Sequence, residues 1–434
     1  MKRRFALFLA LAAVGCGDDE GPEPDGGVPE DAHVRDMPPT PDMGPPPPPT
    51  AEPGRHDAVV VETRRVVPSD ELPVEALNSN NNLDVIRFDG RVYLAWRTAP
   101  DHFASEDTLI HVVSSEDEVR WDFEASFTLG TDLREPAFLD HEGELFLYVS
   151  VLGTESRSFD PQGVMWTRRS PEGTWSDLAD VPNTEGYIAW ATRAIDGVSY
   201  MTAYEGGEHI YRFDGMPLFI ELRTTEDGET WTPLTPNGAP DQTYVYTGGG
   251  SEMDFAFADD GRLHAVIRNE AGDENGWGTM VCDAPADDIA NWTCDVDRKK
   301  YDSPHVFAFD GEIYLVGRRN VTETGFYDVA TDEEDPGQRT LQNQVAYTSG
   351  TKRCSLWRFV QGERRIAYVL DLPSRGDTCF AASLEPGDPT PGEPHDIVIY
   401  DYSSDVDGED VSWREGQRGP TFIYRHVLRL SPRG

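Results

Sequence analysis

Basic residues are scarce in this chain, and lysine is nearly absent. Only four lysines occur, Lys2, Lys299, Lys300 and Lys352, and the formal net charge is −42. A protein that binds nucleic acid needs cationic side chains to neutralise phosphates, so this composition argues against a nucleic-acid partner. An acidic, lysine-poor surface instead stays soluble and hydrated at high salt.

Apolar runs are short. The run Phe5–Val14 cannot span a bilayer, and it follows the basic residues Lys2–Arg4, as in a signal peptide. It ends at Ala13-Val14-Gly15-Cys16, which resembles a bacterial lipobox. That resemblance implies lipidation of Cys16 and predicts an exported lipoprotein of the cell envelope or outer surface, with residues 1–16 as its signal peptide. Ordinary secretion with cleavage nearby is the alternative.

Residues 17–56 contain almost no aromatic or β-branched side chains and are rich in proline, glycine and aspartate, including the run Pro45–Pro49. Such a segment cannot bury enough apolar surface to fold, so we expect a disordered, semi-rigid tether. Residues 57–434 are then the folded domain.

Cysteine is rare too. Apart from Cys16 there are four, and an exported chain can oxidise them. Cys282 and Cys294 flank a short connection that suits a hairpin disulfide, which leaves Cys354 and Cys379 to pair with each other. The spacing suits neither redox nor zinc motifs. We expect no cofactor and no metal in the site, although a structural calcium ion stays open with this many acids.

A repeat is the most informative feature that is present. Five times a short strand runs into an acidic residue and a glycine and then into an aromatic strand; the glycines are Gly90, Gly143, Gly197, Gly261 and Gly311. A period of roughly 50 to 65 residues made of strands predicts one blade of a β-propeller per repeat.

Several repeats continue into a polar turn that ends in tryptophan. The instances are Ser114–Trp121, Ser170–Trp175 and Thr224–Trp231, with a fourth ending at Trp292. They resemble the Asp-box of sialidase-type propellers, Ser-x-Asp-x-Gly-x-Thr-Trp, with Glu226 at the Asp position of the best match. We expect a turn with side-chain-to-backbone hydrogen bonds, fixed by a tryptophan between neighbouring sheets.

A sixth blade is predicted from Asp377–Ser383, Asp396–Tyr402 and Thr421–Leu430, and it lacks a fourth strand. The N-terminal strand Ala58–Val67 has no other place, so we expect it to close the ring as the outer strand of this blade. The fold class is therefore all-β, a six-bladed propeller. The long loop 320–350 is expected at the mouth of the channel.

Charged residues near the ends of the channel-lining strands are the candidate site residues. Paired acids across a cleft suit glycoside hydrolysis, and arginines suit an anionic ligand. The candidate catalytic carboxyls are Glu135, Glu252, Asp302 and Asp377, and the candidate ligand-binding residues are Arg97, Arg134, Arg193, Arg268, Arg319, His305 and Trp190. The alternative is that each arginine pairs with a neighbouring carboxylate and merely joins blades.

From about residue 58 to 430 the chain resembles the sialidase (neuraminidase) superfamily. The resemblance rests on six blades, on the Asp-box-like turns and on Glu252 followed by Arg268. It implies a glycan-acting enzyme in which a blade-four Glu polarises the nucleophile and Arg268 grips a sugar carboxylate, with Arg318 or Arg319 as the next arginine.

Two departures weaken the enzymatic interpretation. Asn80-Asn81-Asn82 stands where the family has Phe-Arg-Ile-Pro, and Phe380 stands where its tyrosine nucleophile is expected. A non-catalytic propeller that binds glycan or protein is therefore the alternative. Arg134-Glu135-Pro136 and Asp302-Ser303-Pro304 also resemble strand starts of five-bladed arabinanase- and invertase-type hydrolases.

The expected partner is a carbohydrate or glycoconjugate. A membrane is expected to be reached only through the lipid anchor, and the protein is expected to be a monomer.

Overall fold

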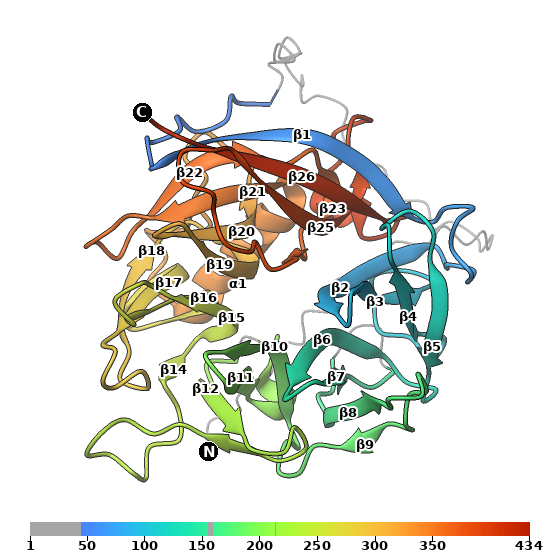
Figure 1. The fold of residues 1–434 in the computed structure, drawn as a ribbon. Helices are drawn as coiled ribbons and strands as arrows, with labels where there is room; N and C mark the ends of the chain where they lie inside the picture. Colours follow the sequence, from blue (N-terminus) through green and yellow to red (C-terminus); the bar gives the residue numbers. More distant parts are fainter. Residues whose placement is uncertain (1–44, 155–158, 213) are drawn as a thin grey trace, which may run out of the picture. The chain divides into compact units, whose positions relative to one another are not determined.

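Six β-sheets are arranged in a ring around a central channel (Figure 1). The computed structural model describes residues 45–154, 159–212 and 214–434. The predicted signal peptide, Cys16 and most of the predicted tether lie outside these residues. The six-bladed propeller expected from the repeat is confirmed.

Each of the first three blades is a four-stranded meander whose first strand lines the channel. Blade one contains β2 (Ser79–Phe88), β3 (Arg91–Ala99), β4 (Leu109–Ser115) and β5 (Asp122–Phe127). Blade two contains β6 (Leu133–His141), β7 (Glu144–Val151), β8 (Gly163–Arg169) and β9 (Ala179–Asp180). Blade three contains β10 (Tyr187–Ile195), β11 (Val198–Glu205), β12 (Leu218–Thr225) and β13 (Trp231–Pro233), with β14 (Tyr246–Gly248) paired to β12 and a 3-10 helix at Gly207–His209.

The remaining blades complete the ring. Blade four contains β15 (Gly250–Phe257), β16 (Leu263–Asp273), β17 (Gly276–Ala284) and β18 (Thr293–Asp297). Blade five contains β19 (Asp302–Phe309), β20 (Glu312–Asn320), β21 (Lys352–Phe359) and β22 (Ile366–Asp371). Blade six contains β23 (Arg375–Thr378), β24 (Ala382–Ser383), β25 (His395–Asp405), β26 (Phe422–Pro432) and β1 (His56–Val67).

The acidic-glycine turns that revealed the repeat are tight hairpins. In four of the five, both turn residues have positive φ; Asp89 and Gly90, for example, have φ values of 46° and 76°. Two consecutive residues with positive φ make a type I′ turn, whose twist matches that of paired strands. In blade four, Gly261 has positive φ and Asp260 does not.

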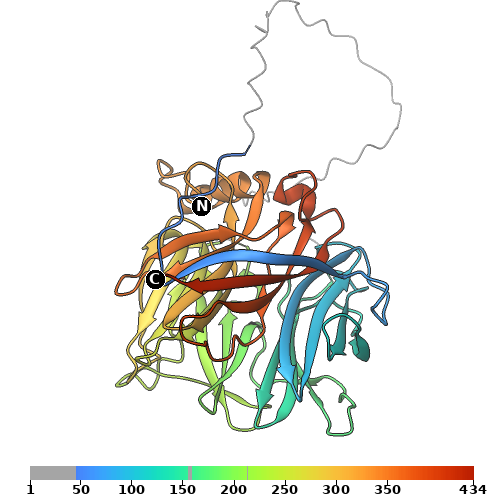
Figure 2. The ribbon, with the colours of Figure 1, turned by 45° about the horizontal axis from the view of Figure 1, so that its top comes forward.

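The N-terminal strand closes the ring, as predicted. β1 pairs antiparallel with β26 from His56 opposite Pro432 to Val67 opposite Ile423, and Figure 2 shows the two strands side by side. Pairing the first and last strands leaves no open gap between blades one and six. Residues Glu52–Arg55, predicted as tether, hydrogen-bond to blade five: the Glu52 amide donates to the Tyr368 carbonyl at 3.2 Å, and the Arg55 amide donates to Glu312 at 2.9 Å.

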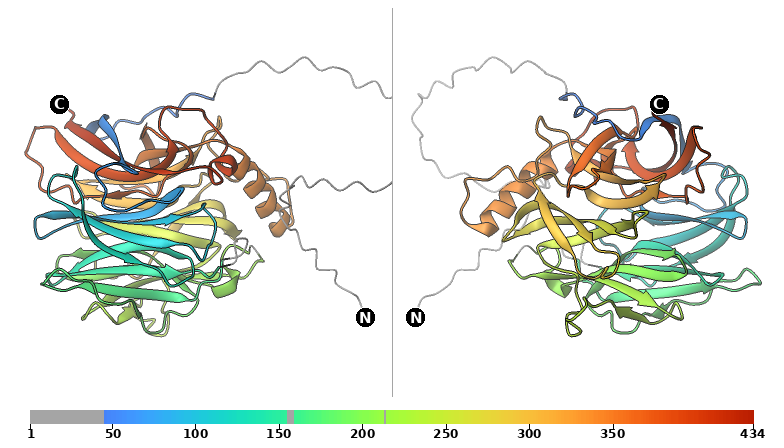
Figure 3. Two further views of the ribbon diagram at one scale, coloured as in Figure 1. Left: turned by 90° about the vertical axis from the view of Figure 1, so that its right-hand side faces the viewer. Right: turned by 60° about the vertical axis from the view of Figure 1, so that its left-hand side comes forward.

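The segment 320–350 is not a loop throughout. It contains the helix α1 (Pro336–Ser349), which stands off one end of the blade-five strands (Figure 3). The side chain of Asp335 caps the helix by accepting from the Gln338 amide, and proline occupies the first helical position. A second, short helix, α2 (Trp413–Gly416), lies between β25 and β26. Neither of these helices of the described chain is long and apolar enough to cross a membrane.

The turn that ends at Trp231 has side-chain-to-backbone hydrogen bonds and a tryptophan packed on the next blade, with one difference from the expectation. Trp231 of blade three is buried and packs edge-on against Tyr148 of blade two, with ring centroids 5.6 Å apart. The turn carboxylate is Asp227, however, and not Glu226. Asp227 accepts the backbone amides of Glu229 and Thr230 at 2.9 and 2.7 Å.

Both predicted disulfides are present. Cys282–Cys294 joins the paired strands β17 and β18 within blade four, and Cys354–Cys379 joins blade five to blade six.

The inner strands of adjacent blades are joined by side-chain hydrogen bonds as well as by packing. A carboxylate oxygen of Asp84 accepts the Phe138 amide of the next blade at 2.6 Å, and Asp254 accepts the Val306 amide in the same way at 2.6 Å. These buried carboxylates satisfy amides that no strand partner reaches.

Candidate functional site

The central channel holds two cavities at opposite ends of the inner strands. The smaller, about 220 Å³, lies where the inner strands begin and is lined by Asn82, Glu135, Glu252 and Ser303 among others. We call it the arginine pocket, because Arg134, Arg268 and Arg318 also line it. The larger, about 640 Å³, lies at the acidic-glycine turns, and we call it the turn-side pocket.

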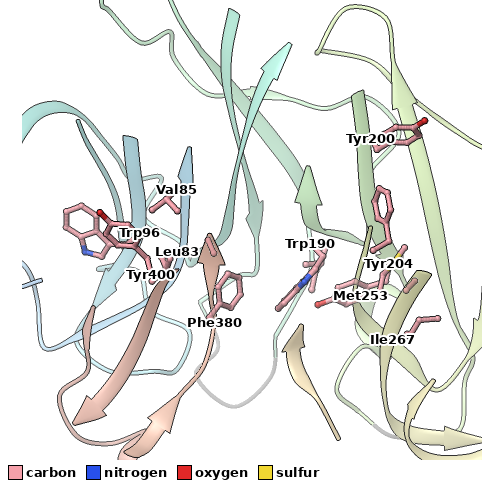
Figure 4. Close-up of a cluster of buried hydrophobic side chains, with 14 of the residues drawn as sticks. Leu83, Val85, Trp96, Trp190, Tyr200, Tyr204, Met253, Ile267, Phe380 and Tyr400 are labelled. Atoms are coloured by element: carbon pink, nitrogen blue, oxygen red, sulfur yellow. The ribbon is translucent and has the colours of Figure 1, made fainter. Parts of the chain in front are cut away.

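An aromatic pair separates the two cavities. Phe380 lines both of them, and its ring packs on Trp190 with centroids 4.9 Å apart. Figure 4 shows the two side chains directed at each other across the channel. The arginine pocket therefore has a closed floor.

The start of nearly every inner strand is irregular. The pairing register shifts between Asn81 and Leu83, between Arg134 and Ala137, between Gly250 and Met253, and between Asp302 and His305. Bulges of this kind re-aim side chains that strict alternation would turn elsewhere. They are the local reason why Glu135 and Glu252 both reach the arginine pocket.

Glu135 is a buried carboxyl with an unusual environment. Its backbone has a φ of 51°, and its side chain accepts a hydrogen bond of 2.7 Å from the Asn82 amide. Burial, reinforced by the nearby charge of Glu252, raises the pKa of Glu135 to about 8. The group is therefore mostly protonated at neutral pH and can donate a proton.

Glu252 is held differently. It accepts from the Arg268 guanidinium at 2.6 Å and from the Ser303 amide at 2.8 Å. Burial raises its pKa, while Arg268 acts in the opposite direction. Of the three carboxyls that line the pocket, Glu135 has no cationic hydrogen-bond partner, Glu252 is paired with Arg268, and Glu270 is paired with Arg268 and Lys300.

The three arginines of the pocket are buried and anchored by carboxylates. Arg134 donates to Asp132 at 2.5 Å, Arg268 donates to Glu252 and to Glu270 at 2.7 Å, and Arg318 donates to Asp302 at 3.2 Å. Each guanidinium also faces an aromatic ring: Phe159 at 4.6 Å, Tyr211 at 5.2 Å and Trp413 at 4.8 Å, respectively. Fixed in this way, the guanidinium groups present donors for a carboxylate without losing rotamer freedom on binding.

Two of the predicted catalytic carboxyls lie behind the pocket. Asp302 is fully buried and accepts from Arg318 and from the Tyr347 hydroxyl at 2.8 Å; burial opposes its ionisation, but Lys300, Arg268 and Arg318 lower its pKa. Asp377 is also fully buried and accepts from His102, Tyr402 and Trp413 at 2.7, 2.9 and 2.8 Å. Neither lines the cavity, so both orient other side chains.

Two of the predicted ligand-binding arginines face away from the pocket. Arg97 is fully buried and donates to Asp132 at 2.9 Å. Arg319 makes a bidentate pair with Asp371, at 2.7 and 2.6 Å. Its neighbour Arg318, which the sequence offered as the alternative, is the one that lines the pocket.

The other predicted ligand-binding residues, Arg193, His305 and Trp190, line the turn-side pocket instead. Arg193 donates to Asp254, and the His305 Nε2 lies 2.8 Å from the Ser383 hydroxyl. Burial and the Arg193 charge lower the pKa of His305 well below its usual range, so the ring is neutral. The His305 Nδ1 lies 3.7 Å from Asp254, beyond hydrogen-bond distance, so the three side chains do not form a serine–histidine–aspartate relay.

Sequence reasoning missed several lining residues. Tyr211, Tyr402, Gln344 and Trp413 line the arginine pocket and come from outside the inner strands. Gln344 belongs to α1 and Trp413 to α2, and neither helix was predicted. A signal for α1 was Asp335-Pro336, an N-cap residue followed by proline.

In the described part of the chain, one group of potential metal ligands comes close enough to hold an ion: Cys354, Cys379 and Asp401. Its two sulfurs are joined in a disulfide, so they are not available as thiolates.

No protein-family model and no curated protein matches this chain. Solved structures do match. The phage phi92 endosialidase has a TM-score of 0.53 at 9% identity, over 88% of this chain and 70% of that chain. The Trypanosoma rangeli sialidase with the inhibitor DANA has a TM-score of 0.52 at 11% identity, over 86% and 60%. The same sialidase in another structure has a TM-score of 0.51 at 12% identity, over 87% and 60%.

This chain therefore spans about 60% of the length of the Trypanosoma rangeli sialidase. At these identities the similarity shows a sialidase-like six-bladed fold and no more. What the pocket does must be argued from its own residues.

Proposed function

We propose that the arginine pocket binds the terminal acidic sugar of a glycan and hydrolyses its glycosidic bond. The observation that carries this proposal is the pairing of a protonated Glu135 with an arginine-bound Glu252 in one small pocket lined by three arginines. The matching sialidase structures, some of which hold sialic acid or DANA, support a sugar ligand by analogy.

In this proposal the three arginines bind the sugar carboxylate. Glu135 gives its proton to the leaving glycosidic oxygen as the bond from that oxygen to the anomeric carbon breaks. Glu252, as a carboxylate, takes a proton from the water molecule whose oxygen forms the new bond to that carbon. Burial raises the pKa of Glu252, and the Arg268 charge opposes that shift by favouring the ionised form. Tyr211 is buried, which raises its pKa, so its hydroxyl stays protonated and donates to the ligand.

The size of the pocket favours a single terminal residue. A volume of 220 Å³ is below the range of about 300–1,000 Å³ that is usual for drug-sized ligands. Trp190 and Phe380 close the floor, so a chain cannot thread through the channel.

The experiment is a screen of the purified protein against aryl glycosides of sialic and uronic acids, with Glu135→Gln as the test variant. Because Glu135 is protonated at neutral pH, glutamine preserves its charge and shape but cannot give up a proton. We expect turnover to fall by at least about 100-fold, with a melting temperature no lower than that of the native protein. The matched control is Glu172→Gln, on an exposed turn. Undiminished turnover in Glu135→Gln contradicts the mechanism.

The second candidate function is glycan binding without hydrolysis. Phe380 favours it, because this side chain lines the pocket where the family resemblance places a tyrosine nucleophile and carries no hydroxyl. Saturable binding of an acidic sugar with no turnover across the panel would select this candidate.

We further propose that the protein is a monomeric lipoprotein anchored at Cys16, with residues 17–51 as tether. The glycan-acting domain then runs from residue 52, where the chain meets blade five, to 434. Two disulfides support an oxidising compartment outside the cytoplasm. Mass spectrometry of the mature N-terminus tests the anchor: an acylated Cys16 is expected, and an intact residue 1 or a free cysteine contradicts it.

A further inference from the structure

We propose that the Cys354–Cys379 disulfide is a positioning element of the arginine pocket, fixing the backbone carbonyls that hold Arg318 in place. This inference rests on the proposed function, because it assigns the disulfide a role in binding the acidic ligand.

The argument begins with the surroundings of Arg318. Its guanidinium donates to two consecutive backbone carbonyls, those of Thr378 and Cys379, the latter at 3.2 Å. It also donates to Asp302 at 3.2 Å and faces the Trp413 ring at 4.8 Å. Arg318 is 3% exposed, so these contacts set where its remaining donors point.

The segment that supplies the two carbonyls is irregular and joins two short strands of its own sheet. Blade six has its channel-side edge split into β23, which ends at Thr378, and β24, which begins at Ala382. Between them, Cys379 has a φ of 79°, a region that side chains other than glycine rarely adopt. The Cys379 amide donates to the Tyr402 carbonyl, and the Phe380 amide donates to the Asp401 side chain, each at 3.1 Å.

The disulfide adds a covalent link from this segment to blade five. Cys354 lies directly opposite Arg318 in the β20–β21 pair. The bridge from Cys354 to Cys379 thus ties the strand pair that carries the arginine to the segment that carries its acceptors. Both cysteines are fully buried, so the connection is fixed inside the molecule.

Neighbours of the bridged residue also shape the pocket. Phe380, the next residue, forms its floor with Trp190. Asp377, two residues earlier, receives hydrogen bonds from His102, Tyr402 and Trp413, which all line the pocket. The segment 377–380 therefore supplies the Phe380 floor and supports three lining side chains, and the disulfide anchors it.

The second disulfide provides a matched control. Cys282–Cys294 joins β17 to the outer strand β18 of blade four, and neither cysteine lines the arginine pocket. Removing it tests the general effect of losing a covalent bridge.

The experiment compares C354A/C379A with C282A/C294A in the full chain, using calorimetric titration with N-acetylneuraminic acid and with glucuronic acid. For the sugar that the native protein binds, we expect the affinity of C354A/C379A to fall by about tenfold or more, because a charge-assisted contact is displaced. The affinity of C282A/C294A should stay within about twofold. Equal losses in the two variants overturn the proposal, as does failure of C354A/C379A to fold while C282A/C294A folds.

A double-mutant cycle shows whether the bridge acts through Arg318. We expect that removing the bridge from R318Q weakens binding by less than about threefold further, since the positioned group is already gone. Fully additive losses overturn the proposed route through Arg318.

Hydrogen exchange of the ligand-free protein separates this inference from the proposed function. Peptides covering 375–383 should exchange faster in C354A/C379A than in the native protein. In C282A/C294A they should exchange at the native rate. If the native protein binds neither sugar, the proposed function fails, and unchanged exchange in 375–383 independently overturns the positioning role.

Discussion

Phe380 packs against Trp190 with ring centroids 4.9 Å apart, and this contact divides the channel into two cavities. The two residues come from blades six and three, on opposite sides of the ring. Trp190 is fixed by a hydrogen bond of 3.1 Å from its indole to the Pro304 carbonyl of blade five. One aromatic contact therefore connects three blades and closes the floor of the arginine pocket.

Removing the Phe380 ring should destabilise the protein. Phe380 is 8% exposed, and truncation of a buried phenylalanine costs about 3–5 kcal/mol, since a cavity remains. We expect Phe380→Ala to lower the free energy of unfolding in urea by about 3 kcal/mol. Phe123→Ala is the control, because that side chain is 55% exposed and should change stability by less than about 0.5 kcal/mol. Equal effects of the two variants would show that the channel contact adds nothing.

Replacing Arg268 should lower the free energy of unfolding more than replacing an arginine in an exposed ion pair. It neutralises both Glu252 and Glu270 inside the protein, at 2.6 and 2.7 Å. Arg268→Met would leave the buried Glu252 without its cation, while Glu270 keeps Lys300 at 2.5 Å. Removing one partner of a buried pair costs about 3–5 kcal/mol. The same change at Arg168, whose pair with Glu144 is exposed, should cost less than about 1 kcal/mol. Chemical denaturation of both variants measures the two losses of stability, and similar denaturation midpoints for the two variants would contradict this prediction.

The repeat could be predicted from the sequence because each blade uses the same local chemistry. An acidic-glycine pair makes the inner hairpin, and aromatic strands fill the space between sheets, so both signals recur with the period of the blade. The closure of the ring could be predicted because the strand at 56–67 has no place in blade one, and the incomplete blade six is the sheet that it completes.

The helix α1 could not be found from hydrophobic periodicity. Its buried side chains are Thr340, Asn343 and Tyr347, two of them polar. Asn343 accepts the amides of Val329 and Ala330 at 2.9 and 3.0 Å. A helix that buries hydrogen-bonding residues gives no apolar stripe for a pattern to detect.

The site was predicted only in part, because the regular alternation of side chains along a strand is interrupted near the site residues. The sequence placed Glu135 and Glu252 at the right end of the channel, but bulges near these residues decide where each side chain points. Within β20, adjacent residues face opposite sides, so Arg318 enters the pocket and Arg319 pairs with Asp371. The sequence alone left that choice open.

The polar turn before Trp231 offers a test of which acid it uses. Asp227 accepts hydrogen bonds from two backbone amides, and it accepts a third from the Thr225 hydroxyl at 3.1 Å. Asp227→Ala should lower the free energy of unfolding by about 0.5–1.5 kcal/mol, because these amides lose their acceptor. Glu226→Ala should have almost no effect, although the motif alignment assigned the turn to Glu226. Thermal unfolding of the two variants distinguishes them, and the reverse order would restore the alignment.

The protonation of Glu135 predicts how stability depends on pH. Burial and the charge of Glu252 raise the pKa of this carboxyl to about 8, above its ordinary value of 4.5 in an unfolded chain. Folding therefore binds the proton more tightly, so the contribution of Glu135 to stability is complete below about pH 4.5. This contribution is lost progressively as the pH rises toward 8, because the Glu135 carboxyl ionises in the unfolded chain but stays protonated in the native protein.

Glu135→Gln removes this titration. We expect the stability of the native protein, measured by urea denaturation, to fall between pH 5 and 9 more steeply than that of Glu135→Gln, with the two curves approaching each other near pH 5. The proposed hydrolysis should decline over the same upper range, since an ionised Glu135 has no proton to give. Parallel stability curves for the two proteins would show that Glu135 is ionised at neutral pH, and the proton-donor role would then fail with it.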